Sequence, residues 1–309
     1  MRQPDPKATI GAIQSLPVPA SLLGESPLWH PLEQVLYWCD IPGRALHRFD
    51  PAAPLAQAHR TWQFHTEVAC CAARAGGGLL LALRDGLWQF DSADAQRTQL
   101  ATAPYPTATQ RFNDGKVDPQ GRFWCGTIPE PRDAPAANLY RWASGRLQRA
   151  AGGVTVSNGL AWSAAGDTVY WADTPGHVVY ACPFDAASGS LGTRRIFASF
   201  APRDPSTTPS SYGGRPDGAT VDAEGCYWVA MFEGGCLLRL SPAGERLQTI
   251  TLPVRCPTMP CLGGPDLRTL YVTTSRENRP AQELADHPWS GQVLQMRVDV
   301  PGLPASLAA

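Results

Sequence analysis

The sequence predicts an all-β protein, a six-bladed β-propeller, from its composition, a repeated strand pattern and the period of that repeat. Glycine (29) and proline (30) are abundant among the 309 residues, and charged residues make up only 17%. Turn-rich β structure needs Gly, Pro, Asp and Asn at short intervals. Alanine is frequent, but it never falls into a long helical stripe. The composition therefore favours many short strands over helices.

One unit recurs six times along the chain: a polar turn, an apolar strand, a hairpin and then an aromatic-rich strand. The aromatic-rich strands recur at intervals of 43, 43, 47, 57 and 44 residues, measured between Tyr37, Leu80, Phe123, Tyr170, Tyr227 and Tyr271. A period of about 40–50 residues with three or four strands per unit is typical of propeller blades. Six units predict six blades.

The six units account for nearly the whole chain, so we expect one domain over residues 1–309, with a short N-terminal segment (about 1–8) and a C-terminal tail (about 301–309). Residues 9–21 alternate in polarity and are expected to close the ring with the last blade, which leaves only short edges. Two Pro-rich stretches, 129–137 and 201–215, either cover one mouth of the central channel or are surface insertions.

Composition also excludes several classes of partner. The net charge is −1 and no basic patch stands out, so neither nucleic acid nor a membrane surface is an expected partner. The chain has no 18-residue apolar run, and its first 20 residues lack the apolar core of a signal peptide. Nine cysteines without CxxC spacing predict buried thiols in a reducing cytoplasm. We expect a monomer or a weak homo-oligomer.

Polar residues stand where the innermost strand of a blade should begin, at one mouth of the channel. Glu25, Asn113-Asp114, Asn158 and Asp217 occupy this position in four units, while the second and sixth units are nearly apolar there. Taken singly, Asn-Gly and Asp-Gly are ordinary turn formers. Converging on one axis, the same side chains would repel or lose solvation unless a cation balanced them. An all-oxygen set suits a hard cation, and three protein ligands leave positions open for water and substrate.

Five sequence segments resemble the gluconolactonase/regucalcin (senescence marker protein) family of six-bladed propellers. They are LGESPLW, RFNDGKVDPQGRFWCGT, SNGLAWS, PDGATVDAEGCYWVA and CLGGPDLRTLYVTT, and the resemblance covers roughly residues 23–298. It implies one divalent metal bound by Glu25, Asn158 and Asp217. Calcium is our first choice, and Zn²⁺, Mn²⁺, Mg²⁺ or Fe²⁺ would also suit oxygen ligands.

The same resemblance implies that Arg111 and Asn113 contact the hydroxyl groups of the substrate. Asp114 is expected either to support the site from behind or to be a plain turn residue. Some relatives use an acidic residue after the third blade, for which Glu130 and Asp133 are the nearest candidates here. Asp173 is expected either near the mouth or at a strand end.

The predicted function is a metal-dependent lactonase that opens a sugar (aldono-) lactone to the aldonic acid in bacterial-type sugar catabolism. The metal polarises the carbonyl, and Asp217 acts as general base, as ligand or as both. One alternative is a non-enzymatic metal-binding or scaffold propeller; another is a promiscuous phosphotriesterase or arylesterase. A serine esterase is disfavoured because Gly-x-Ser-x-Gly is absent, and a His-rich zinc site because the six histidines form no HxH or HExxH pair.

Overall fold

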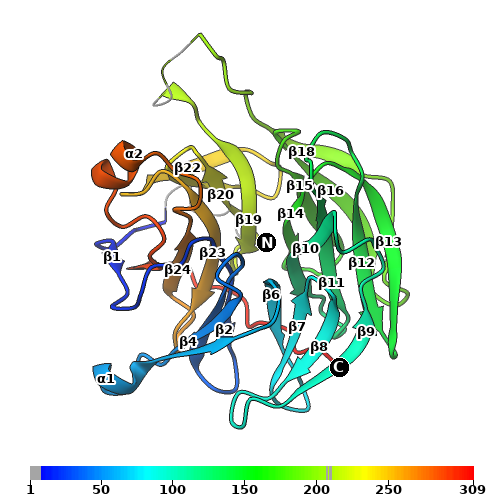
Figure 1. Cartoon of the computed structure of the whole chain (residues 1–309). Helices are drawn as coiled ribbons and strands as arrows, with labels where there is room; N and C mark the ends of the chain where they lie inside the picture. Colours follow the sequence, from blue (N-terminus) through cyan, green and yellow to red (C-terminus); the bar gives the residue numbers. More distant parts are fainter. Residues whose placement is uncertain (1–7, 207, 209–210) are drawn as a thin grey trace.

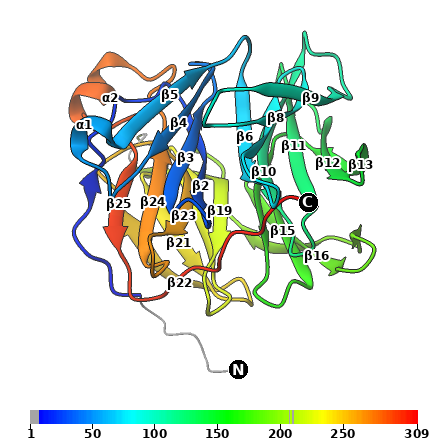
Figure 2. The ribbon, with the colours of Figure 1, turned by 90° about the horizontal axis from the view of Figure 1, so that it is seen from below.

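The computed structural model describes residues 8–206, 208 and 211–309, in which six antiparallel sheets stand around a common axis (Figure 1). The α-helices within this part of the chain are α1 (Leu55–Ala58) and α2 (Ala281–Asp286). The sheets follow one another around the ring in chain order, and Figure 2 shows the ring from the side. The predicted all-β, six-bladed propeller is confirmed.

Each blade begins with its innermost strand and continues outward. Blade I comprises β2 (Gly24–His30), β3 (Val35–Asp40), β4 (Ala45–Phe49) and β5 (His59–Gln63). Blade II comprises β6 (Val68–Ala73), β7 (Leu79–Leu83), β8 (Gly86–Phe90) and β9 (Arg97–Thr102). Blade III comprises β10 (Gln110–Val117), β11 (Phe123–Pro129), β12 (Ala137–Ala143) and β13 (Arg146–Val154).

The second half of the ring departs once from four strands per blade. Blade IV has five: β14 (Ser157–Trp162), β15 (Thr168–Asp173), β16 (Val178–Asp185), β17 (Ser190–Leu191) and β18 (Arg195–Ser199). Blade V comprises β19 (Arg215–Val221), β20 (Tyr227–Phe232), β21 (Cys236–Leu240) and β22 (Arg246–Thr251). Blade VI comprises β23 (Pro257–Gly263), β24 (Thr269–Thr274), β25 (Leu294–Arg297) and β1 (Gln14–Ser15).

Both ends of the chain help to close the ring. Strand β1, within the segment predicted to do so, pairs with β25 through Gln14↔Gln295 and Ser15↔Leu294. The C-terminal tail then crosses the axis, because Gly302 bridges to Asp222 of blade V and Ala308 bridges to Arg74 of blade II (red in Figure 2). The expected N-terminal segment falls on residues 1–7, outside the described residues, and on Ala8, which is buried.

The core is divided among the interfaces between blades. The buried apolar residues of the described chain form six clusters, and each joins two neighbouring blades around the ring. The aromatic-rich strands used to find the repeat are the second strands of the blades, and four of them carry a fully buried tryptophan: Trp38, Trp124, Trp171 and Trp228. Because each sheet packs on both faces, its inner strands read as nearly continuous apolar runs.

Blades III and V fix their first hairpin in the same way. Asp118 accepts a hydrogen bond from the indole Nε1 of Trp124 at 3.0 Å, and Asp222 accepts one from Trp228 at 2.8 Å. Both aspartates also accept backbone N–H groups of the turn. The shared spacing Asp-x-x-Gly-x-x-Trp therefore has a structural cause, since each buried carboxylate satisfies the turn and the indole together.

Candidate functional site

A recurrent β-bulge presents the predicted site residues at the start of the innermost strands. The pairing of first and second strands shifts register near this point in all six blades, for example between Glu25 and Leu28, between Asn158 and Ala161, and between Pro216 and Ala219. A bulge bends the strand and re-aims a side chain that regular alternation would direct into the sheet. The equivalence of strand starts, used to pick these residues from the sequence, thus reflects one backbone feature repeated around the ring.

The glycines that follow these residues have a packing role. Gly159 has φ +59°, and a Cβ on it would collide with the hydroxyl of Tyr227; a Cβ on Gly218 would collide with the side chain of Met259. The inner strands crowd together near the axis, so only glycine fits directly after Asn158 and Asp217. The Asn-Gly and Asp-Gly pairs are therefore parts of bulged inner strands and not hairpin turns.

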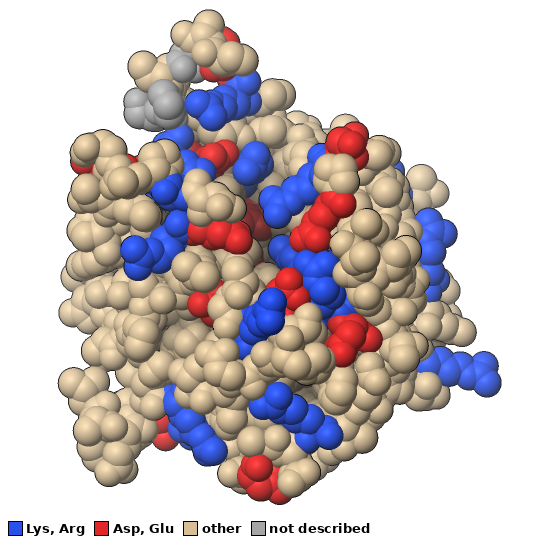
Figure 3. Space-filling model, viewed as in Figure 1, with Lys and Arg blue, Asp and Glu red and all other residues tan. Residues whose placement is uncertain are grey.

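A cavity of about 370 Å³, which we call the mouth cavity, lies at this end of the axis. Its lining includes five residues singled out from the sequence: Glu25, Arg111, Asn113, Asn158 and Asp217. Figure 3 shows acidic and basic side chains gathered around the central hollow of the face seen in Figure 1. The structure thus brings the predicted metal ligands and the predicted substrate contacts together in one cavity.

A chain of hydrogen bonds joins these side chains across three blades. Arg111 Nη1 donates to Asn113 Oδ1 at 2.9 Å, and Asn113 Nδ2 donates to Asn158 Oδ1 at 2.8 Å. Asn158 Nδ2 donates to Asp217 Oδ1 at 2.6 Å and to Thr174 Oγ1 at 2.8 Å. The orientation of each group depends on the next, which favours a pre-organised site.

The carboxylates of the mouth cavity lie where charge is costly. Glu25 and Asp217 are only 8% and 6% exposed. Burial raises the pKa of Glu25 well above its ordinary value, and the charges of Asp217 and Asp114 raise it further. Burial also raises the pKa of Asp217 to about 8, although the charges of nearby arginines oppose this. Ionising both carboxylates therefore costs free energy unless a proton or a bound cation neutralises part of their charge.

That setting fits a hard divalent cation. Two repelling carboxylates and the amide of Asn158 face one cavity and offer only oxygen ligands of the kind such ions prefer. Within the described ranges, no three His, Cys, Asp or Glu side chains gather as a metal site. Any cation held here would therefore need the amide oxygen of Asn158 as well as the two carboxylates.

Asp114 lies behind the cavity wall. It is buried, its Oδ2 accepts a hydrogen bond from the backbone N–H of Leu160 at 2.8 Å, and its Oδ1 has no hydrogen-bond partner in the described part of the chain. Burial raises its pKa to about 6. Because Leu160 follows Asn158 by two residues on β14, this bond joins Asp114 of blade III to the strand that carries Asn158.

The remaining acidic candidates are placed apart from the centre. Glu130 pairs with Arg84 at 3.1 Å and lies 3.9 Å from Nε of Arg111, so it supports that arginine from outside the cavity. Asp133 is exposed and does not line the mouth cavity. Asp173 accepts the backbone N–H groups of Thr155 and Val156, which corresponds to the strand-end role.

The sequence did not single out several residues that line the mouth cavity. Thr174 bridges Asn158 to the backbone oxygen of Pro216. Three further arginines reach the cavity: Arg132, Arg215 and Arg279. The first two belong to the Pro-rich stretches 129–137 and 201–215, so each stretch contributes to the mouth. A signal existed in the sequence, since both stretches carry arginine beside proline, but spacing alone does not give the direction of a loop side chain.

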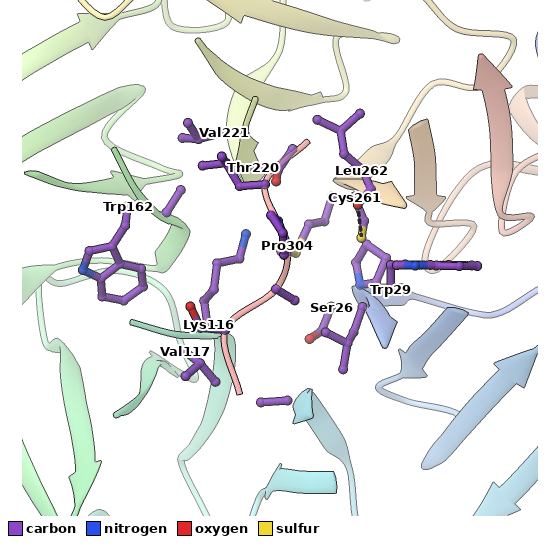
Figure 4. A pocket seen from close by; sticks show the side chains of 18 of the residues that line it. Ser26, Trp29, Lys116, Val117, Trp162, Thr220, Val221, Cys261, Leu262 and Pro304 are labelled. Atoms are coloured by element: carbon purple, nitrogen blue, oxygen red, sulfur yellow. Dashed lines mark hydrogen bonds between the residues drawn. The ribbon is translucent and has the colours of Figure 1, made fainter. Parts of the chain in front are cut away.

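A second cavity, of about 430 Å³, lies at the opposite end of the axis (Figure 4). The far halves of the inner strands line it, and the tail around Pro304 crosses it. Its lining is mostly apolar, and Lys116 donates from Nζ to the backbone oxygen of Ala219 at 2.8 Å. Burial lowers the pKa of this lysine, against the opposing charge of Asp114. None of the predicted ligands lines this cavity, so the candidate site is the mouth cavity.

Two further findings concern whole-chain properties. All nine cysteines are free thiols, and eight of them are buried, as the spacing predicted. Of the helices in the described residues, none has the length and apolar character needed to cross a bilayer.

Comparison with known proteins identifies relatives of this chain. A family model described as the SMP-30/gluconolactonase/LRE-like region matches residues 23–276. The chain is 49% identical over 290 residues to the 6-deoxy-6-sulfogluconolactonase of Pseudomonas putida, covering 94% of this chain and 96% of that protein. It is 35% identical over 254 residues to the pentonolactonase XacC of Haloferax volcanii, covering 82% and 81%.

A solved structure gives the same picture of the fold. The calcium-binding protein regucalcin from Agrobacterium tumefaciens matches with a TM-score of 0.87 at 27% identity, covering 97% of this chain and 98% of that one.

Proposed function

The chain belongs to the SMP-30/gluconolactonase/LRE-like family, and on this premise we propose that it is a metal-dependent lactonase that hydrolyses an aldonolactone to the aldonic acid. The observation that carries the proposal is the convergence of Glu25, Asn158 and Asp217 with Arg111 and Asn113 in one cavity. A calcium store would need the first three residues only, whereas an enzyme also needs groups that orient a substrate.

Glu25, Asn158 and Asp217 would hold the cation. When bound, a divalent cation supplies Lewis-acid polarisation of the lactone carbonyl and makes water more acidic. We take calcium as the first choice, because the ligands are all oxygen and a solved relative is described as calcium-binding. Adding Ca²⁺, Zn²⁺, Mn²⁺, Mg²⁺ or Fe²⁺ in turn to the metal-free protein identifies the cation that supports turnover.

Asp217 is proposed as the general base. Its Oδ1 accepts the hydrogen bond from Asn158, while no described residue donates to its Oδ2. The Oδ2 atom is thus available to take a proton from water as the water oxygen bonds to the lactone carbon. The ring C–O bond then breaks, and the proton passes to the ring oxygen, which leaves as the hydroxyl of the aldonic acid. Because the other oxygen can bind the cation while Oδ2 takes the proton, Asp217 can serve as both ligand and base.

Arg111 is proposed to position the sugar ring. Its Nη1 is held by the backbone oxygen of Phe112 and by Asn113, both at 2.9 Å, which fixes the plane of the guanidinium. The rest of that rigid fork can donate to ring hydroxyl groups. Asn113 uses its Nδ2 on Ser157 and Asn158, so a substrate hydroxyl would reach its Oδ1.

The first candidate substrate is the one named for the relative of 49% identity, a gluconolactone that carries a sulfonate at C6 in place of the hydroxyl. Pentonolactones form the second class, after the relative of 35% identity. The experiment compares wild type with Asp217→Ala in a pH-indicator assay on both classes, together with metal content. We expect the variant to lose both activity and metal. Lactone hydrolysis by Asp217→Ala at the wild-type rate would refute the proposal, and tight metal binding without turnover by wild type would favour a non-enzymatic propeller.

A further inference from the structure

One arginine at the mouth cavity is not committed to any protein partner. Arg132 lies in the loop after β11, lines the cavity and is exposed. No hydrogen bond or ion pair joins it to another described residue. The other lining arginines are engaged: Arg111 with Asn113, Arg215 with Glu233, and Arg279 with Glu233 and Glu283. A free guanidinium at the rim of a binding cavity is available for a ligand.

Arg132 shares its cavity with the centre of the site. The proposed base Asp217 and the proposed sugar-positioning residue Arg111 line the same cavity as Arg132. A substrate that contacts Asp217 and Arg111 could also contact Arg132.

Arg215 supplies a second positive charge from the other side of blade IV. Its Nη2 lies 3.4 Å from Glu233, whose other oxygen accepts a shorter bond of 2.8 Å from Arg279, so one carboxylate serves two arginines. The guanidinium of Arg215 also lies over the ring of Phe232, at 5.2 Å from its centroid. Arg132 comes from blade III and Arg215 starts blade V, so the two flank the part of the mouth lined by Thr174 and Pro175.

Charged side chains of both signs line the mouth. Arg111, Arg132 and Arg215 come from blades III and V, whereas Glu277 and Arg279 follow β24 of blade VI. Figure 3 shows basic side chains around the hollow, with acidic ones among them. Because Arg279 is paired with Glu233 and Glu283, an anionic group would find uncompensated positive charge at Arg132, on the side of blade III.

Building on the proposed function, we propose that Arg132, assisted by Arg215, selects lactones that carry a permanently charged oxyanion, a sulfonate or phosphate ester, at the end of the sugar remote from the lactone carbonyl. Guanidinium groups bind such oxyanions through two parallel charge-assisted hydrogen bonds. Arg132 contacts the remote group and not the reacting atoms, so it sets specificity and leaves the hydrolytic step to Asp217 and Arg111.

The test compares substrates that differ in this group alone: gluconolactone, its 6-deoxy-6-sulfo analogue and its 6-phosphate. The kcat/KM of wild type is measured against that of Arg132→Gln, of Arg132→Lys, and of Arg146→Gln as a control at an exposed arginine outside the cavity. We expect Arg132→Gln to lower kcat/KM for the charged lactone by roughly 10- to 50-fold, mainly through KM, because a charge-assisted contact is lost. Gluconolactone should change less than about twofold, Arg132→Lys should recover part of the loss, and Arg146→Gln should behave as wild type.

A binding measurement keeps the inference testable apart from turnover. Calorimetry with the ring-opened acid, 6-deoxy-6-sulfogluconate, should show binding to wild type that weakens with added salt and falls at least tenfold in Arg132→Gln. Two results in Arg132→Gln would overturn the inference: an equal loss of kcat/KM on charged and neutral lactones, or unchanged binding of the sulfonated acid. Either result would leave the proposed lactonase function standing. Failure of the proposed function appears differently, as binding of the acid without hydrolysis of any lactone. A larger Arg132 effect on the sulfonate than on the phosphate, or the reverse, identifies the oxyanion.

Discussion

Asn158 donates a hydrogen bond from Nδ2 to Oδ1 of Asp217 at 2.6 Å, although the two residues are 59 positions apart and start the innermost strands of different blades. Thr174 strengthens the junction, because it accepts from Asn158 and donates to the backbone oxygen of Pro216. The relative position of the two proposed ligands is therefore fixed by the closure of the ring. The rigidity of the site therefore depends on how firmly blade IV packs against blade V.

Replacing the proposed base with its amide should affect stability and activity in opposite directions. Asp217→Asn keeps the shape and the acceptor for Asn158, but it removes a buried carboxylate that repels Glu25 and Asp114. We expect the Tm of the metal-free protein at pH 9 to rise and kcat to fall by about a thousandfold or more, as for loss of a general base and a metal ligand. Asp133→Asn, outside the cavity, is the control and should change neither. A variant that hydrolyses lactone at a near-normal rate would remove Asp217 from the mechanism.

Metal binding should release protons and strengthen as pH rises. The pKa of Asp217 is raised from 3.8 to about 8 and that of Asp114 from 3.8 to about 6, so folding without metal favours the protonated forms. Their contribution to stability is full below about pH 3.8 and is lost as pH rises through about 6 and then 8. A cation requires the ionised carboxylates. Its apparent affinity should therefore increase from pH 6 to about 8 and level off above.

Two measurements check this linkage. Thermal unfolding of the metal-free protein should show Tm declining between pH 5 and 9, and calorimetry in buffers of different ionisation enthalpy should show proton release on metal binding at pH 6. An affinity that stays constant from pH 6 to 9 would contradict the raised pKa values.

Lysine cannot replace Arg111. The guanidinium is buried and held by Phe112 and Asn113, so its geometry matters in addition to its charge. Arg111→Lys should lower kcat/KM for the lactone by about 100-fold, as expected from loss of oriented hydrogen bonds to the substrate. Metal affinity, measured by titration, should stay within about threefold. A matching loss of metal affinity would show that Arg111 supports the ligands and not the substrate.

The ion pair of Asp222 and Arg239 should matter for stability alone. Both side chains are 0% exposed, their atoms lie 2.9 Å apart, and Asp222 also accepts from the indole of Trp228. Asp222→Ala would leave the guanidinium with Glu224 as a remaining partner. We expect a loss of about 3 kcal/mol in the free energy of unfolding, at the lower end for a broken buried pair. Urea denaturation measures the loss, and kcat of the folded variant should be unchanged; a smaller loss in Asp222→Asn would confirm the role of the acceptor.

Much of the architecture was predictable from the sequence because a propeller repeats the same arrangement of strands in every blade. Each blade needs an apolar second strand to fill the interface with its neighbour, so residues such as Tyr37 and Tyr227 mark the period directly. The strand starts were also comparable between blades, because the same bulge recurs. This is why Glu25, Asn158 and Asp217, far apart in the sequence, could be grouped and then found in one cavity.

The features that the sequence did not reveal belong to single blades or to loops. Among the described residues, the fifth strand of blade IV has no equivalent in the other blades, and the bridges from the tail to Arg74 and Asp222 depend on the path of a segment outside the repeat, so no repeat points to them. Arg132 and Arg215 reach the cavity from stretches whose length varies between blades, and their direction depends on the folded loop. Thr174 follows a strand end like many others, and only its contact with Asn158 gives it significance.

The central claim about this protein is that hydrolysis requires a cation at the mouth cavity. The most direct measurement is aldonolactone hydrolysis by chelator-stripped protein, before and after titration with Ca²⁺, Zn²⁺, Mn²⁺, Mg²⁺ or Fe²⁺. We expect no turnover above the spontaneous rate without metal and full recovery near one equivalent of the preferred cation, whereas Asp217→Ala should stay inactive before and after metal is added. Undiminished hydrolysis by the stripped wild-type protein would contradict a metal-dependent mechanism.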